Sequence, residues 1–431
     1  MDVQIQRSTV IAASEPTSKP LELPLTVFDR YASDLHIAVL FAFSPPIPMN
    51  SDIIDALTKT LLLHFPTLAA RLDGLRHRPC LILGGGGDGA LVVEAAVDSI
   101  LEDHLPILPS EKMTRFHPSC TDPAKLLQVQ LTRFRCGGLV VGVTAHHRVA
   151  DGQSMSNFYV AWGRIARGLP INRIPGYDIS WLRPRFPPKL EFEHWGVEFV
   201  PVPPHSTKPF PLELAQVEPT KIANVLLRYS HEFIESELKA SLRERFTTFE
   251  VLLAHVWRKL TAVRGLSHGE TTKGRVTVNG RRRLRPPVAD EFVGNLVICA
   301  HTSATVGELM DGGLAGAARR VREGVRRIDD AYFRSVIDFG EEYKEAELVP
   351  VYEREGNLLS PNMEAESWLG FQFQEMDFGG GTLRAFIPSW VPVEGLVIFL
   401  PSLAEEGGVN VMVALLQEDA EILKTISHTL S

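Results

Sequence analysis

The chain has 431 residues, of which 45% are apolar and 22% charged, and its formal net charge is −8. This length predicts two domains of a soluble globular protein, because one ordinary core rarely grows so large. The negative balance excludes the basic surface that nucleic acids need. No apolar run approaches the roughly 18 residues that cross a bilayer, so we expect a cytoplasmic protein without a membrane partner.

The cysteines give no sign of a metal site or of a disulfide framework. They are four in number and scattered without CxxC spacing, at Cys80, Cys120, Cys136 and Cys299. Isolated cysteines of this kind are usually buried thiols of a reducing compartment. We therefore expect no bound metal.

Strand-like segments surround one helix in the first hundred residues. Strands are predicted at residues 3–5 and 36–43, on either side of a proline-bearing stretch. Ser51 is the predicted N-cap of a helix that ends before Pro66. The glycine-rich run at residues 84–89 lies between two β-forming segments, which favours a hairpin turn over a phosphate-binding loop.

The motif HHRVADG, residues 146–152, lies at a predicted junction between a strand and a helix. The alternating segment 127–134 and the apolar run 139–144 are expected to form a hairpin that leads into it. His147 then follows a buried strand directly, in a position where loops often carry chemistry. Asp151 comes four residues later, and apolar residues recur at helical spacing after Gly152.

Residues 170–215 are dense in proline and show no sustained periodicity, which is typical of a semi-rigid connector. We therefore predict an N-terminal domain at residues 1–169 and a C-terminal domain at residues 216–431. In the second domain, a helix follows the capping-box pair Thr247 and Glu250.

A longer helix is expected over about residues 306–333, and strands dominate the closing third of the chain. Because helices and strands alternate in both halves, the sequence predicts an α/β or α+β fold with two sheets.

Two distant segments bear on the histidine motif. The run VNGRRRLRPP supplies Arg281, whose guanidinium can hold the Asp151 carboxylate in a bidentate pair. The segment DFGGG, from Asp377 to Gly381, predicts a glycine-rich turn.

In this order and at these distances, the motifs resemble those of the plant BAHD acyltransferases, which transfer acyl groups from coenzyme A thioesters. The family's HxxxDG signature matches residues 147–152, and its DFGWG signature matches residues 377–381. The region between them, DxRxRxxPP…GN, is represented by Asn279, Arg281, Arg283, Pro286, Pro287, Gly294 and Asn295. The resemblance covers essentially the whole chain. It implies two chloramphenicol acetyltransferase-like domains with a tunnel between them, which coenzyme A enters from one face and the acceptor from the other.

The resemblance also implies the role of each signature residue. His147 would be the general base at the centre of the tunnel. The remaining residues would be structural: Asp151 beside Gly152 would pair with Arg281 rather than relay protons, and Asp377 with Gly379 would form a turn. No permanently bound cofactor is implied, since the acyl-CoA is a co-substrate.

The sequence departs from the family pattern at Asn279, where aspartate is usual, and at Gly380, where tryptophan is usual. The DFGGG spelling, with SPN and SW upstream, resembles the cereal subgroup that acylates amines. This implies transfer of a hydroxycinnamoyl or benzoyl group to tryptamine, tyramine, agmatine or putrescine, giving a phenolamide of plant specialised metabolism. We expect a monomer.

An amine acceptor arrives as an ammonium with a pKa of roughly 10.4, whereas histidine titrates near roughly 6.5 and is available as a neutral base. No covalent acyl-enzyme is needed, so a ternary complex is expected. The candidates for holding the acceptor cation are acidic residues and a neighbouring tryptophan: Glu364, Glu366, Glu375, Asp338 and Trp368. The candidates for the coenzyme A phosphates are Arg282, Arg285, Lys273 and the arginines around Arg319.

Three alternatives stay open from the sequence. One is an O-acyltransferase of the same family that acts on an alcohol. Another is a serine hydrolase, because GQSMS at residues 152–156 nearly spells the GxSxG nucleophile elbow. The third is a relative that binds an acyl-CoA without turnover.

Overall fold

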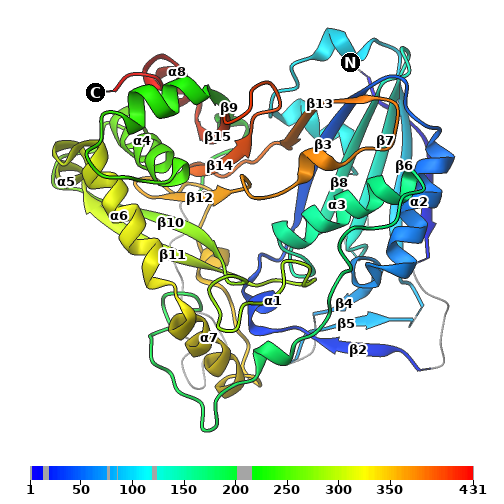
Figure 1. Ribbon diagram of the computed structural model, residues 1–431, viewed down its shortest axis with the longest axis horizontal. Helices are drawn as coiled ribbons and strands as arrows, with labels where there is room; N and C mark the ends of the chain where they lie inside the picture. The colour runs from blue at the N-terminus through cyan, green and yellow to red at the C-terminus, as the bar shows by residue number, and fades with distance from the viewer. Residues whose placement is uncertain are drawn as a thin grey trace.

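The computed structural model describes residues 2–12, 19–74, 78–84, 86–118, 124–200 and 216–430. Two six-stranded sheets lie side by side, and helices cover them (Figure 1). A third sheet of three strands adjoins them. The predicted α/β fold with two sheets is confirmed. Cys120, Gly85 and the connector beyond residue 200 lie outside the described residues.

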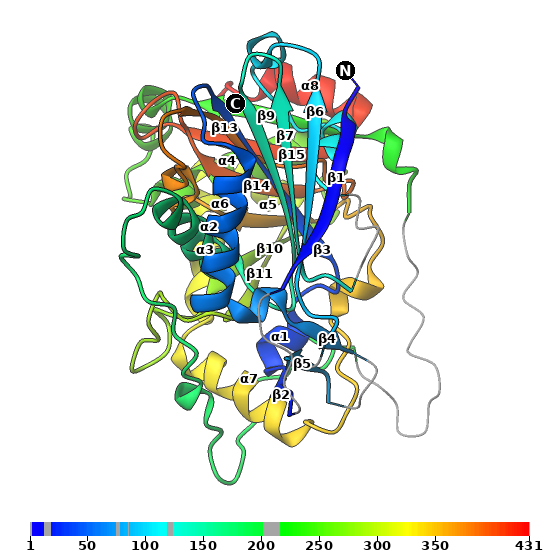
Figure 2. The ribbon, with the colours of Figure 1, turned by 90° about the vertical axis from the view of Figure 1, so that its right-hand side faces the viewer.

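The first sheet carries the histidine motif. Its strands are, in spatial order, β1 (Gln4–Ile11), β6 (Ala90–Val97), β7 (Leu127–Phe134), β8 (Leu139–His146), β3 (His36–Ser44) and β13 (Thr382–Pro388). All neighbours are antiparallel except β6 and β7. The predicted hairpin is confirmed as β7–β8, in which Leu131 faces Val141. The helices α2 (Asn50–Leu63) and α3 (Gly152–Ala166) pack against each other beside this sheet (Figure 2).

The second sheet runs in the order β11 (Val297–Thr305), β10 (Thr271–Asn279), β12 (Met363–Ser367), β14 (Leu396–Pro401), β15 (Val409–Leu416) and β9 (Ile222–Tyr229). Its main helix, α4 (Thr248–Val263), begins at the predicted capping box, in which Thr247 and Glu250 bond each other's backbone. Helix α4 contacts α6 (Gly313–Arg327) and α8 (Gln417–Ile426). The sequence did not predict α8, the last helix of the chain.

Each half of the chain contributes an element to the other half. Strand β13 lies within the range 216–431 that the sequence assigned to the C-terminal domain, yet it pairs with β3 of the first sheet, where Phe386 faces Phe41 (Figure 1, orange beside blue). Conversely, Phe28 of α1 (Val27–Tyr31) is buried in the core of the second sheet. The predicted range 216–431 is therefore not a self-contained packing unit.

The glycine-rich run does not form the predicted hairpin. It joins β5 (Cys80–Leu83) to β6, but β5 belongs to the small sheet β2 (Leu21–Pro24), β5, β4 (Arg71–Asp73), whereas β6 belongs to the first sheet. The prediction failed because turn residues are a local signal, whereas strand pairing is decided by distant partners. Gly89 is constrained by the packing, since a Cβ there would lie 2.7 Å from the carbonyl oxygen of Ile11.

Two helix predictions need correction. The helix expected over 306–333 is three helices, α5 (Val306–Asp311), α6 and α7 (Asp330–Glu342), because Gly313 has a φ of 62° and Asp329 caps a new helix start. Ser51 is not the cap of α2. That helix begins at Asn50 after Met49, without a side-chain cap.

Shorter helical turns complete the fold. They lie at Pro66–Ala69, Leu101–His104, Glu111–Phe116, Ser180–Leu182, Phe233–Lys239, Pro219–Lys221, Val351–Arg354 and Phe373–Glu375. Within the described ranges, no helix has the length and apolar character needed to cross a membrane.

Candidate active site

His147 directly follows the last residue of β8, as predicted. Its backbone is held on both sides, because its N–H donates to the carbonyl oxygen of Leu35 at 2.9 Å and its own carbonyl accepts from Asn295 Nδ2 at 2.9 Å. The ring behaves differently. Nδ1 of His147 is buried and meets no hydrogen-bond partner among the described residues. The fold thus fixes the position of the histidine and leaves its imidazole available for chemistry.

Asp29 is a positioning residue that sequence reasoning missed. Asp29 Oδ1 accepts from both the backbone N–H and Nδ2 of Asn295, each at 3.0 Å, and that same amide group holds His147. Burial raises the pKa of Asp29, and hydrogen bonds from Asn295 and Thr26 oppose this shift. The available signal was the capping-box spacing of Thr26 and Asp29, which fixes α1 and thereby the carboxylate.

Asp151 is fully engaged by its neighbours. Its Oδ2 lies 2.7 Å from Arg281 Nη1, and its Oδ1 lies 3.0 Å from Nη2 of the same residue. The backbone N–H groups of Ser154 and Leu296 also donate to it. Burial alone would raise the pKa of Asp151, but the Arg281 charge and these hydrogen bonds hold it below its ordinary value. The predicted contact is present, and it leaves Asp151 unable to relay protons to His147.

The departure at Asn279 is accommodated by its amide oxygen. Asn279 Oδ1 accepts from the backbone N–H of Arg281 at 3.0 Å and from its Nη1 at 3.4 Å. A neutral acceptor therefore meets Arg281, and Asp151 remains its charged partner. Gly152 is equally constrained, since a Cβ there would lie 2.4 Å from Phe371 Cε2.

Ser154, the central serine of GQSMS, is built into the same network. Only 1% of its surface is exposed. Its hydroxyl lies 2.9 Å from the carbonyl oxygen of Gly294 and accepts from Arg281 Nη2 at 3.2 Å. A nucleophile must reach its substrate and have a base in hydrogen-bond contact. Ser154 has neither, so the geometry does not favour the serine hydrolase alternative.

The acidic strand β12 brings Glu366 towards His147. Glu366 is partly buried, and it accepts a hydrogen bond from Trp368 Nε1 at 3.2 Å. Burial and the nearby Glu364 raise the pKa of Glu366, while His147 and Trp368 lower it. Glu366 therefore lies within electrostatic range of the histidine.

Glu364, two residues earlier on the strand, has a different environment. Its carboxylate is paired with Arg275, whose Nη2 lies 2.5 Å away. Glu364 therefore shares the charge of Arg275 with Glu355, whereas Glu366 receives the indole N–H of Trp368 and lies in the fields of His147 and Glu364.

The other predicted acceptor residues lie elsewhere. Asp338, on α7, accepts from Arg185 Nε at 2.6 Å and from the backbone N–H of Lys189 at 2.9 Å, so it anchors the connector. These donors occupy its carboxylate, and its predicted role with the acceptor cation stays a prediction. Glu375 is exposed on a short turn, where it accepts from Gln372 Nε2 at 2.9 Å.

The DFGGG segment forms a surface turn at the end of α3. Asp377 Oδ2 lies 2.8 Å from Arg167 Nη1, and its Oδ1 accepts from the backbone N–H of Gly379 at 2.8 Å. Gly379 and Gly380 have φ values of 90° and 94°, and a Cβ at Gly380 would lie 2.7 Å from the carbonyl oxygen of Pro46. A tryptophan at residue 380 would require a different turn, which explains why this chain has glycine there.

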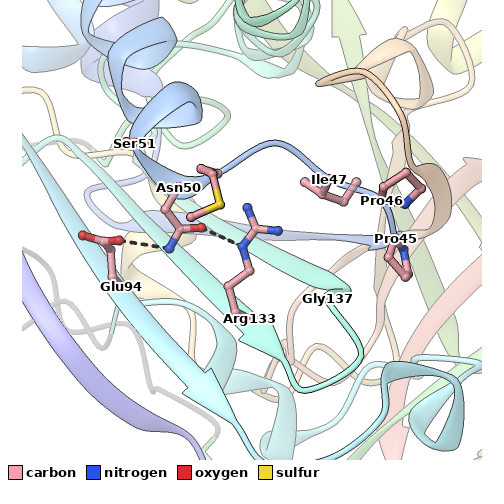
Figure 3. Close-up of a pocket in the computed structure, with 9 residues that line it drawn as sticks. Pro45, Pro46, Ile47, Asn50, Ser51, Glu94, Arg133 and Gly137 are labelled. Atoms are coloured by element: carbon pink, nitrogen blue, oxygen red, sulfur yellow. Dashed lines mark hydrogen bonds between the residues drawn. The ribbon is translucent and has the colours of Figure 1, made fainter.

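A large open cavity lies beside this turn and away from the histidine. Its volume is about 670 Å³, and the start of α2 forms one wall. Asn50 bridges Glu94 and Arg133 there (Figure 3). His147 does not line this cavity. The tunnel expected at His147 stays a prediction.

The residues predicted for coenzyme A are on the surface. Arg282 has 83% of its side chain exposed and is paired with Asp290 at 2.8 Å, and Arg319 is paired with Glu244. Arg285 and Lys273 are also exposed. Their donor-binding role stays a prediction. Across the described ranges, no group of three or more potential ligand side chains is arranged for a metal ion.

Comparisons with known proteins identify the family of the chain. The model of a family described as the transferase family matches residues 1–429. Agmatine hydroxycinnamoyltransferase 1 of Oryza sativa subsp. japonica is 38% identical over 423 residues, covering 95% of this chain and 93% of that protein. Putrescine hydroxycinnamoyltransferase of the same plant is 36% identical over 464 residues and covers 100% of both chains. Tryptamine benzoyltransferase 1, again from that plant, is 35% identical over 442 residues, covering 99% of this chain and 98% of that protein.

Solved structures share the fold. Vinorine synthase has a TM-score of 0.76 at 20% identity, with 99% of this chain and 98% of that chain covered. TRI101 of F. graminearum, complexed with coenzyme A and T-2 mycotoxin, has a TM-score of 0.70 at 17% identity, with 94% and 97% covered. Both likenesses support the predicted chloramphenicol acetyltransferase-like fold. With the family model spanning its two sheets and the histidine motif in place, the chain belongs to the BAHD family of acyltransferases.

Proposed function

We propose that the protein transfers an aromatic acyl group, hydroxycinnamoyl or benzoyl, from coenzyme A to the nitrogen of a small amine. The observation that carries this proposal is a His147 ring whose buried Nδ1 meets no hydrogen-bond partner among the described residues, together with the partly buried carboxylate of Glu366, on which the histidine acts electrostatically. A carboxylate attracts an ammonium acceptor directly, whereas a neutral alcohol gains no such charge pairing. The amine acceptors named in the relatives support the same choice.

In this mechanism, Glu366 holds the acceptor as its ammonium and His147 takes a proton from the nitrogen. The neutral nitrogen then attacks the thioester carbonyl, and the tetrahedral intermediate collapses as its carbon–sulfur bond breaks. The second proton of the nitrogen passes to the departing sulfur, so that coenzyme A leaves as the free thiol and the amide is neutral. The carboxylate of Glu366 also stabilises the imidazolium that His147 becomes, because opposite charges favour each other at short range. The acyl group passes directly from sulfur to nitrogen within a ternary complex.

His147 works without an aspartate behind it. Asp151 is bonded to Arg281, so the orientation of His147 comes from its backbone contacts with Leu35 and Asn295. This differs from a triad, in which a carboxylate fixes the imidazole directly. Trp368 has a supporting role, since its indole N–H orients the carboxylate of Glu366.

A matrix of acyl donors and acceptors tests the proposal. Purified protein is mixed with coumaroyl-CoA or benzoyl-CoA and with agmatine, putrescine, tryptamine or tyramine, and the products are identified by mass spectrometry. We expect an amide whose formation accounts for the coenzyme A released. Thiol release that is independent of added amine would indicate a hydrolase. Preferential ester formation with matched alcohols would indicate an O-acyltransferase.

A further inference from the structure

A second cavity lies between α1, α7 and the connector. Its volume is about 220 Å³. In Figure 2, α1 and α7 lie beside each other at one end of the molecule, and the two helices are in contact. The walls are largely apolar and include Leu25, Val27, Leu182 and Ile337. His147 is not among its lining residues.

Three cationic side chains line this cavity against a single acid. The cations are Arg30, Arg78 and Lys344, and the acid is Glu341. Lys344 Nζ is paired with Glu341 Oε1 at 2.6 Å. Arg78 is paired with Glu345 outside the cavity lining. Two of the three positive charges thus have their own carboxylates.

Arg30 is the cation without a carboxylate. Only 8% of its surface is exposed, and its guanidinium donates to the carbonyl oxygens of Lys344 and Ala346. No ion pair joins it to an acid in the part of the chain that the structure describes. Burial, followed by the charges of Arg148 and Arg78, lowers the pKa of Arg30 to about 10. The surroundings of this guanidinium are therefore short of negative charge.

A buried cation is costly to a protein unless an anion compensates it. A guanidinium meets a carboxylate through two parallel hydrogen bonds, and apolar walls favour a ligand whose remaining body is apolar. We propose that this cavity binds a small apolar carboxylate, of about the size of benzoate, with its carboxylate on Arg30. Inorganic phosphate supplies the charge but has no apolar body to fill the walls.

The position of the cavity relates it to the reaction centre. Arg30 follows Asp29 on α1, and Asp29 holds Asn295, which in turn holds the backbone of His147. The occupant of the cavity would therefore be separate from the substrates but would lie against the helix that positions the histidine. An aromatic carboxylate is also the free acid of the acyl groups in the proposed reaction, so the ligand class is related to the chemistry of the donor.

Calorimetric titration of the full chain with benzoate tests the proposal, with benzyl alcohol and inorganic phosphate as matched probes. Benzoate is expected to bind more tightly than either probe. Arg30→Met is expected to weaken benzoate binding about ten-fold or more, since a charge-assisted bidentate contact is lost. Lys344→Gln, on the rim, is expected to weaken it about two-fold to three-fold, because an exposed charge acts through solvent.

Two further variants keep the test decisive. Lys424→Gln is the matched control, because Lys424 pairs with Glu421 at 2.6 Å with the same spacing as Lys344 with Glu341, but on α8. It is expected to leave benzoate binding unchanged. Leu182→Phe fills the cavity while Arg30 stays in place, and it is expected to abolish benzoate binding. This variant tests the proposal even if Arg30→Met fails to fold. Equal benzoate affinity in wild type and Leu182→Phe, no benzoate binding by wild type, or tighter binding of either probe would overturn the proposal.

Discussion

Two carboxylates near His147 have opposite environments. Asp151 belongs to a network that we call the brace, formed with Arg281, Ser154 and Asn279, and an ion pair and several N–H groups occupy both of its oxygens. Glu366, on β12, receives one indole N–H and the field of the histidine. The pKa of Asp151 is lowered and that of Glu366 is raised.

This contrast shows that closeness in the sequence does not predict which carboxylate interacts with the histidine. Asp151 follows His147 by four residues yet is paired with Arg281, whereas Glu366 comes more than two hundred residues later and its pKa is lowered by the charge of the histidine. A carboxylate whose two oxygens are both occupied by protein donors stabilises the fold. A carboxylate with few donors retains capacity for a cationic ligand.

Removing the proposed base, His147, is expected to have the largest effect. His147→Ala should lower kcat by about 10²–10⁴-fold, which is the range for loss of a general base. Thermal unfolding should stay close to that of wild type, because the histidine backbone, and not its ring, makes the contacts that hold it. Amide formation at a near-normal rate would contradict the assignment.

Breaking the brace is expected to act first on stability. Asp151→Asn should lower the free energy of unfolding by about 3–5 kcal/mol, because Arg281 is left buried without its counter-charge. Urea unfolding measures this loss. In a variant that also carries Arg281→Met, the combined loss should be smaller than the sum of the two single losses, since both changes remove one interaction. If the two single losses of unfolding free energy simply add, the ion pair between Asp151 and Arg281 does not account for them.

The pH dependence of stability should separate the two carboxylates. The folded pKa of Asp151 lies below its ordinary 3.8, so its contribution is present above that value and is lost as the pH falls through the folded pKa. The folded pKa of Glu366 lies above its ordinary 4.5, so its ionisation weakens the fold as the pH rises through the folded pKa.

Glu366→Gln is therefore expected to leave the free energy of unfolding near neutral pH unchanged or to raise it by up to about 1 kcal/mol, since it removes a partly buried charge. Urea unfolding at several pH values measures this sign. A destabilisation comparable to that of Asp151→Asn would mean that Glu366 is a structural residue as well.

The smallest effect is expected at the DFGGG turn. Asp377→Asn breaks an ion pair in which 30% of Arg167 and 43% of Asp377 are exposed, and such pairs contribute about 0–1 kcal/mol. Activity should stay within about two-fold of wild type, because the turn lies on the surface and acts through its backbone. A loss of kcat close to that of His147→Ala would indicate that Asp377 takes part in proton transfer.

Local patterns in the sequence predicted the parts of the fold that depend on neighbouring residues. The apolar run before His147 gave a buried strand, the capping box at Thr247 gave the start of α4, and the HxxxD and RxR spacings anticipated the contact of Asp151 with Arg281.

Features that depend on contacts between distant parts of the chain could not be predicted from the sequence. The sequence does not show that β13 joins the first sheet, that β5 and β6 belong to different sheets, or that Asp338 is occupied by the connector. The role of Asp29 also depends on α1 packing against the core of the second sheet.

The central claim is that Glu366 recognises the amine beside His147. Steady-state kinetics of Glu366→Gln with agmatine and coumaroyl-CoA tests it most directly, and Asp377→Asn serves as the control. The KM for the amine is expected to rise about ten-fold or more, because a hydrogen bond to a charged group contributes about 1.5–3 kcal/mol, while the KM for the donor stays unchanged. An unchanged KM for the amine, or an equal rise for both substrates, would contradict the account.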